Sequence, residues 1–221
     1  MAATLTATTT HPASVANTAH FESVYADAQG DMSKIRWADG RPNPAMVKWL
    51  NENAHSLLRC GSRVCVVGCG LGHDAAELSA RGYEVTAFDC SGTAIEWAKR
   101  IHPEHTGCFQ QGDLFKPSLR WRHRFDLVVE INTVQALPPD TQLGAMSAVA
   151  DLVSPRGRLL IICRHATESP AIESGPPWPL TESFVTEAAG LAGLEAEQPL
   201  SAFEDDEQPP VRRMMGLFKR I

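Results

Sequence analysis

One stretch, Val64–Asp74, constrains the fold of this chain more than any other. It reads VCVVGCGLGHD: a run of apolar residues, then glycines at positions 68, 70 and 72, then the expected start of a helix at Asp74. Glycine permits backbone conformations and close approaches that other residues do not, and the first turn of a helix offers unpaired N–H groups. A buried strand, a glycine turn and a helix in this order are typical of a site for a nucleotide-like ligand.

Apolar runs and helical patterns alternate along the chain around this stretch. Strands are expected at residues 64–67, 84–88, 107–110, 125–131 and 158–163, the last of them after a turn at 155–157. Their apolar runs are continuous, which is typical of parallel strands covered on both faces. After a helix at 181–192, strands at 195–203 and 211–221 predict a C-terminal antiparallel hairpin at the sheet edge. The expected fold is α/β: a Rossmann-like, open, mostly parallel seven-stranded sheet with helices on both faces.

The length of 221 residues suits one large domain. Residues 1–20 are rich in Ala and Thr and poor in large apolar groups, so we expect a disordered tail there. Residues 21–221 are expected to form a single domain that begins with a helical segment at 21–60. In that segment Asn43 and Pro44 predict a helix start.

Composition narrows the classes of partner. A net charge of −6 without a dense Lys/Arg run argues against nucleic acid. No apolar stretch approaches the roughly 20 residues needed to cross a bilayer, and the N-terminus lacks the pattern of a secretory signal. The six cysteines include no C-x-x-C pair with ligand spacing, which argues against zinc, and most lie in or beside predicted buried strands. We therefore expect a cytoplasmic protein without disulfides, metal or membrane contact, a monomer or homodimer that acts on a small molecule.

Polar residues follow the predicted strands, where an open parallel sheet binds its ligand. They are Asp89 after the second strand, Asp113 after the third, Glu130 and Asn132 after the fourth, and Arg164 and His165 after the fifth. An acidic residue about 20 positions after the glycine turn can accept hydrogen bonds from both hydroxyls of a ribose. The G-x-G-x-G spacing differs from the dinucleotide fingerprint, and a carboxylate at Asp74 would repel a pyrophosphate but suits an ammonium group. The pattern favours a nucleoside that carries an amino acid.

The segments VVGCGLGHD, EVTAFD, QGDLF and FDLVVEI, with the strand after Pro155-Arg156-Gly157, together resemble the class I S-adenosylmethionine-dependent methyltransferases. The resemblance covers about Arg63 to Arg164. It implies S-adenosyl-L-methionine as the cofactor, with the glycine turn beside its methionine part, Asp89 on the ribose and Asp113 at the adenine amino group. The cofactor-binding residues expected on this basis are Trp37, Gly68, Cys69, Gly70, Gly72, Asp89, Cys90, Asp113, Leu114 and Glu130.

Two further segments resemble the thiopurine methyltransferase-like group. They are Ile35-Arg36-Trp37 with Asp39-Gly40-Arg41-Pro42, and Gly175-Pro176-Pro177-Trp178-Pro179. This narrower resemblance implies an N-terminal lid with Trp37 against the cofactor, and an acceptor that is a small thiol, a halide or another soft nucleophile. Glu130-Ile131-Asn132 departs from the Asp-Arg pair that the best-known members of the group carry after the fourth strand.

Methyl transfer from a sulfonium can rest mainly on holding the acceptor and the methyl group in line. A thiol loses its proton readily, whereas a hydroxyl or ring nitrogen calls for a general base, for which His165, His73 and Glu130 are candidates. Arg164 is a candidate to bind an anionic substrate.

The sequence therefore predicts methyl transfer to a small molecule, preferentially to a thiol or other soft nucleophile on a heterocycle. Three alternatives stay open: O- or N-methylation of a small aromatic natural product, a repurposed cofactor-binding protein without methyl transfer, and methylation of a macromolecule. The segments around Trp37, Gln135 and 175–178 are expected to select the acceptor.

Overall fold

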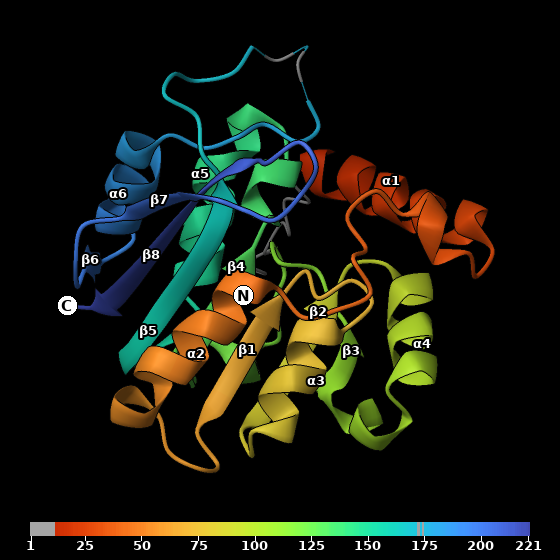
Figure 1. Ribbon diagram of the computed structural model, residues 1–221, viewed down its shortest axis with the longest axis horizontal. Coiled ribbons are helices and arrows are strands. Elements are labelled where there is room, and N and C mark those ends of the chain that lie inside the picture. The colour runs from red at the N-terminus through yellow and green to blue at the C-terminus, as the bar shows by residue number, and fades with distance from the viewer. Residues whose placement is uncertain (1–11, 172, 174) are drawn as a thin grey trace, which may run out of the picture.

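A computed structural model describes residues 12–171, 173 and 175–221 of the chain (Figure 1). One sheet runs through the molecule in the order β3-β2-β1-β4-β5-β8-β6, and β7 also pairs with β8. The strands are β1 (Arg63–Val67), β2 (Glu84–Asp89), β3 (Phe109–Gln111), β4 (Phe125–Ile131), β5 (Val153–Arg164), β6 (Leu194–Ala196), β7 (Ser201–Glu204) and β8 (Arg212–Arg220). The first five strands pair in parallel, and β8 runs antiparallel to β5.

The eight labelled strands fill seven positions in the sheet. Segments β6 and β7 pair with successive stretches of β8, at 218–220 and 212–215 respectively, and so occupy one edge position together. The strand expected at 195–203 is thus interrupted near Pro199, which has no backbone N–H to donate to a neighbouring strand. The expected open, mostly parallel α/β sheet with a terminal antiparallel hairpin is confirmed.

Helices cover both faces of the sheet (Figure 1). They are α1 (Pro12–Ala28), α2 (Pro44–Leu57), α3 (His73–Ala80), α4 (Gly92–Ile101), α5 (Pro139–Ala150) and α6 (Glu182–Leu191), with short 3-10 turns η1 (Met32–Lys34), η2 (Pro103–Cys108), η3 (Leu119–Trp121) and η4 (Val134–Ala136). The expected start of α2 is confirmed, because the Asn43 side chain accepts hydrogen bonds from the backbone N–H groups of Ala45 and Met46. In the part of the chain that the structure describes, no helix is long and apolar enough to cross a membrane.

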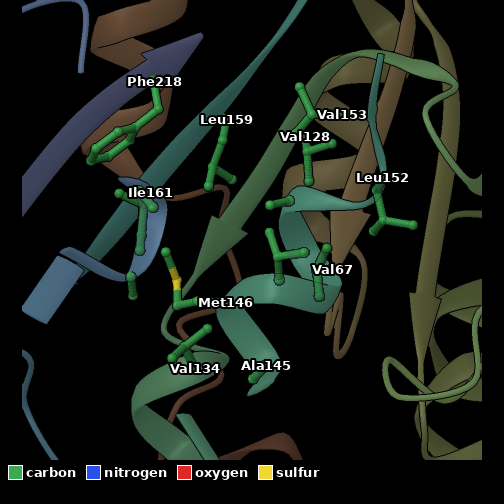
Figure 2. Packing of buried hydrophobic residues seen from close by; sticks show 14 of the residues in the cluster. Val67, Val128, Val134, Ala145, Met146, Leu152, Val153, Leu159, Ile161 and Phe218 are labelled. Atoms are coloured by element: carbon green, nitrogen blue, oxygen red, sulfur yellow. The ribbon is translucent and has the colours of Figure 1, made fainter. Parts of the chain in front are cut away.

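Alternation of side chains along the strands divides the core in two. In β1, Val64 and Val66 face α2 and α3, whereas Cys65 and Val67 belong to the cluster under α5 and α6. Figure 2 shows that second cluster, where Met146 of α5 packs near Ile161 of β5. Each such fully buried aliphatic side chain stabilises the fold by roughly 1.5–3 kcal/mol. Because β1 and β4 are buried on both faces, residues 64–67 and 127–129 in them are continuously apolar.

Two expected boundaries differ in the structure. Helix α1 begins at Pro12, inside the segment where a disordered tail was expected at 1–20, while positions 1–11 lie outside the described residues. A proline suits the first turn of a helix and the alanines that follow favour helix, while the expected division at residue 20 stays a prediction.

The expected turn at 155–157 is a bulge inside β5 instead of a break before it. The pairing of β4 with β5 shifts register there, from Phe125 opposite Val153 to Leu127 opposite Arg158. A Cβ atom added at Gly157 would lie 2.4 Å from the carbonyl oxygen of Phe125. Only glycine lets the bulged strand approach its neighbour this closely.

Candidate functional site

The glycine turn after β1 has the backbone conformation that its sequence predicts. Gly68, Gly70 and Gly72 have φ angles of +59°, +50° and +82°, a region that favours glycine. A Cβ atom at Gly68 would lie 2.4 Å from the hydroxyl oxygen of Thr133, and one at Gly72 would lie 2.5 Å from the ring of Phe109. The turn is therefore fitted tightly between the end of β4 and the start of β3.

Asp89, the last residue of β2, reaches this turn. Its Oδ2 atom accepts a hydrogen bond from the backbone N–H of Gly70 and its Oδ1 atom one from that of Ser91, both at 2.9 Å. The residue is 7% exposed, and burial raises the pKa of its carboxyl group. Each carboxylate oxygen can accept more than one hydrogen bond.

Helix α1 and the segment after it cover the turn. The Tyr25 hydroxyl oxygen would lie 2.9 Å from a Cβ atom at Gly70, and it accepts a hydrogen bond from Trp37 Nε1 at 2.8 Å. The Trp37 ring, 45% exposed, meets the rings of Phe21 and Tyr25 edge-on. Tyr25 thus links Trp37 to the glycine turn, a contact that the sequence does not predict.

Glu22 of α1 fixes that helix to the start of α4. Its carboxylate accepts hydrogen bonds from the Ser91 hydroxyl at 2.7 Å, and from the hydroxyl and the backbone N–H of Thr93. These hydrogen bonds, the Thr93 hydroxyl first among them, lower the pKa of Glu22. A carboxylate at the positive end of a helix is favourable. Because Ser91 also donates to Asp89, α1 is coupled directly to the end of β2.

The end of β3 carries the next expected residues. The Asp113 Oδ1 atom accepts from the backbone N–H of Phe115 at 2.9 Å, and Leu114 packs into the core at 7% exposure. The side-chain amide of Gln111 donates to the carbonyl oxygen of Cys90, which joins β3 to the residue after Asp89. Burial raises the pKa of the Cys90 thiol to about 12 and that of the Cys69 thiol well above its usual value, so both are protonated at neutral pH.

Glu130, at the end of β4, is fully buried beside the turn. Its Oε1 atom accepts from the backbone N–H groups of Thr133 at 2.6 Å and Val134 at 3.0 Å, while its Oε2 atom has no hydrogen-bond partner among the described residues. Burial raises the pKa of this carboxyl group to about 7. Glu130 is paired in register with Val67, the residue before the glycine turn. It can therefore exchange a proton near neutral pH.

A polar network lies at the ends of β4 and β5. Gln135, 3% exposed, accepts at Oε1 from the backbone N–H of Arg164 at 2.6 Å and donates from Nε2 to Asn132 at 3.0 Å. Its carbonyl oxygen accepts from the backbone N–H of Trp178 at 2.7 Å. The structure thus brings together Gln135 and the 175–178 segment, which were expected to select the acceptor.

The other candidate bases are less well placed. His165 Nδ1 accepts from Arg212 Nε at 3.1 Å, in an exposed position where β5 ends and β8 begins. His73 packs edge-on against His102 beyond the end of α4, and burial lowers its pKa. Asp74, whose charge was expected to suit an ammonium group, accepts from the backbone N–H of Asn43 at 2.6 Å, and burial raises its pKa to about 6.

Known proteins are similar to this chain in sequence and in fold. Residues 64–157 match the family described as a methyltransferase domain. A curated relative, the magnesium-protoporphyrin O-methyltransferase of Rhodobacter capsulatus, is 37% identical over 112 residues, which make up 46% of this chain. The alignment spans about half the length of that relative, 49%.

Two solved structures share the fold. Magnesium protoporphyrin IX methyltransferase from Synechocystis PCC 6803, with bound S-adenosylhomocysteine, has a TM-score of 0.70 at 17% identity and covers 92% of this chain and 99% of its own. The second structure is that of a protein from echinomycin biosynthesis, described with the conversion of a disulfide bond into a thioacetal group. It has a TM-score of 0.69 at 22% identity, and the match covers 92% of each chain. The family match extends over β1 to the bulge of β5 and includes the glycine turn and Asp89, so this part of the chain is similar to a methyltransferase domain.

Proposed function

We propose that this protein transfers the methyl group of S-adenosyl-L-methionine to a small molecule. The observation that carries the proposal is the contact between the Asp89 carboxylate and the Gly70 backbone N–H, 2.9 Å apart at the ends of β2 and β1. It puts a carboxylate that can accept from ribose hydroxyls beside a turn in which every second residue is glycine. The family match over the same residues supports it.

The residues around that contact fit such a cofactor. The backbone of Gly68, Cys69, Gly70 and Gly72 would border its methionine part, and Asp89 would bind its ribose. Cys90, Asp113 and Leu114 would hold the adenine, because they lie where the ends of β2 and β3 meet. Trp37, held by Tyr25, would close the site from the α1 side. The buried carboxylate of Glu130 would border the site from the end of β4.

When bound, the cofactor supplies an activated methyl group on a sulfonium, so the protein's task is to orient the acceptor and exclude water. A thiol acceptor follows from the narrower resemblance to the thiopurine methyltransferase-like group. The fold is similar to that of the echinomycin-biosynthesis protein described with the conversion of a disulfide bond into a thioacetal group, and this similarity is compatible with a sulfur acceptor. A thiol needs little help in losing its proton near neutral pH.

An oxygen or nitrogen acceptor is the second candidate, and one observation favours it. Glu130 has a carboxyl pKa of about 7 and an oxygen without a hydrogen-bond partner among the described residues. Such a group can take a proton from a hydroxyl or a ring nitrogen as the methyl group is transferred. The curated relative, named as an O-methyltransferase, points the same way.

Two experiments test the proposal in sequence. Isothermal titration calorimetry should detect S-adenosylhomocysteine binding to the full chain, and absence of heat would reject the proposal. Cofactor with a labelled methyl group should then label at least one member of a panel of thiols, phenols, carboxylates and N-heterocycles. Binding without transfer to any of them, or labelling of macromolecules alone, would favour the alternatives. Gel filtration of the same sample would distinguish a monomer from a homodimer.

A further inference from the structure

Two arginines stand at the sheet end that carries Glu130. Arg164 is the last residue of β5 and is paired in register with Arg213 near the start of β8. Arg213 Nη1 donates to Asn132 Oδ1 at 3.2 Å, and Asn132 directly follows β4. Gln135 joins the backbone of Arg164 to the same Asn132 side chain. The Arg213 guanidinium and the Arg164 backbone are therefore both tied to the loop that follows Glu130.

The acidic loop between β7 and β8 meets these arginines. Asp205 Oδ2 accepts from Arg213 Nε at 2.6 Å, and Asp206 pairs with Arg41 of the N-terminal segment at 2.7 Å. Glu207 reaches both guanidinium groups, since its Oε1 atom accepts from Arg213 Nη2 and its Oε2 atom lies 4.0 Å from Arg164 Nη2. The loop thus joins the start of β8 to the end of β5 and, through Arg41, to the N-terminal segment.

The two carboxylates on Arg213 differ in how firmly they are held. The Asp205 side chain is 13% exposed and also accepts from the backbone N–H groups of Val211 at 2.8 Å and Glu207 at 3.1 Å. The Glu207 side chain is 41% exposed and its carboxylate contacts the two arginines. It can rotate into water while the backbone of the loop stays fixed by Asp205. Glu207 is therefore the replaceable partner.

Charge and shape indicate what would replace it. Asp205 offsets one of the two positive charges, so the departure of Glu207 leaves one positive charge and the free donors of two guanidinium groups. A planar carboxylate matches guanidinium donors geometrically and forms charge-assisted hydrogen bonds with them. The position is half-buried, where such bonds are screened less than on an open surface.

We propose that Glu207 occupies the site for a carboxylate group of the methyl acceptor, and that Arg164 and Arg213 bind that group once Glu207 turns away. The inference rests on the proposed function and deepens it: the acceptor is a small organic anion. Glu207 closes the site with its own carboxylate when the acceptor is absent.

Benzoate is a probe that needs neither cofactor nor acceptor. In an NMR titration of the full chain, benzoate should shift the side-chain Nε–Hε signals of Arg164 and Arg213, and the neutral analogue benzamide should not. Glu207→Gln should tighten benzoate binding about fivefold, because a competing charge is removed. The control Glu204→Gln removes a charge from an exposed residue of the same hairpin and should leave the affinity unchanged. Equal affinities in the two variants, or no shift of the arginine signals, would overturn the proposal.

A kinetic comparison tests the site in the working enzyme. For an acceptor that carries a carboxylate and that the enzyme methylates, Arg164→Gln should raise KM about tenfold with kcat little changed. For the amide analogue of that acceptor, the same substitution should change KM by less than about twofold. An equal rise for both compounds would contradict the inference. Failure of S-adenosylhomocysteine to bind would refute the proposed function. The benzoate titration would still test, independently, whether Arg164 and Arg213 bind a carboxylate.

Discussion

The Asp89 carboxylate is the residue on which cofactor binding should depend most. Changing Asp89 to Asn preserves its shape but removes the charge that accepts from the ribose hydroxyls, and we expect the affinity for S-adenosylhomocysteine to fall roughly 30-fold, about 2 kcal/mol. Calorimetry measures this directly. The matched control is Asp126→Asn, since Asp126 pairs with Arg63 at the opposite end of the strands and should change the affinity less than about twofold. A similar loss in both variants would mean that Asp89 has only a structural role.

Glu130 should make stability depend on pH in a defined window. Its pKa is about 7 in the folded protein against a usual value of 4.5, so the folded state holds a proton that the unfolded state releases. The stability that this proton contributes is complete below about pH 4.5 and is lost as the pH rises through 7. Glu130→Gln removes this dependence. The unfolding free energy of the variant relative to the original protein should therefore rise on the order of 3 kcal/mol between pH 4.5 and pH 8.

Denaturant unfolding at several pH values checks this expectation. Asp74 and Asp89, whose pKa values burial also raises, are present in both proteins and cancel in the difference. A difference that does not vary with pH would show that the pKa of Glu130 is the same in the folded and the unfolded protein.

At the scale of elements, the bulge in β5 depends on one glycine. A Cβ atom at Gly157 would lie 2.4 Å from the carbonyl oxygen of Phe125 and 2.9 Å from the backbone nitrogen of Ser154, so Gly157→Ala forces backbone to move. We expect a loss of about 2–4 kcal/mol in the free energy of unfolding. Gly107→Ala is the control, because a Cβ atom there would have no heavy atom within 4 Å. Equal unfolding midpoints for the two variants would refute the steric argument.

Helix α1 should be able to detach from the glycine turn while the rest of the domain stays folded. Glu22 joins it to Ser91 and Thr93 at the start of α4, and Glu22→Gln weakens that contact without changing the shape of the side chain. Amide hydrogen exchange within α1 should then quicken about three- to tenfold, while exchange in β1 and β4 stays the same. The control Glu96→Gln removes an exposed charge from α4 that pairs with Lys99. Unchanged exchange in α1 would show that apolar contacts alone hold the helix.

At the scale of the whole molecule, the sequence predicts structure that short segments determine. It does not predict contacts between residues that are far apart in the chain. The buried strands, the cap at Asn43 and the place of Asp89 at the end of β2 follow from short patterns that fix their own backbone. The contacts of Glu207 with Arg164 and Arg213 do not, because each charge is equally compatible with exposure to water. Tyr25 was missed for a similar reason, since an aromatic residue on a helix gives no sign of meeting a glycine turn far along the chain.

Because α1, the glycine turn and the ends of β2 to β4 come from different parts of the chain, cofactor binding should stabilise the whole domain. At a concentration 100-fold above its dissociation constant, S-adenosylhomocysteine should add about 2.7 kcal/mol to the free energy of unfolding. For a chain of this size that corresponds to a rise in Tm of about 5–10 °C, measurable by calorimetric scanning. Asp89→Asn at the same ligand concentration should lose most of that rise, and Asp126→Asn should keep it. A rise in Tm that survives in Asp89→Asn would place the ligand away from the ends of β1 and β2.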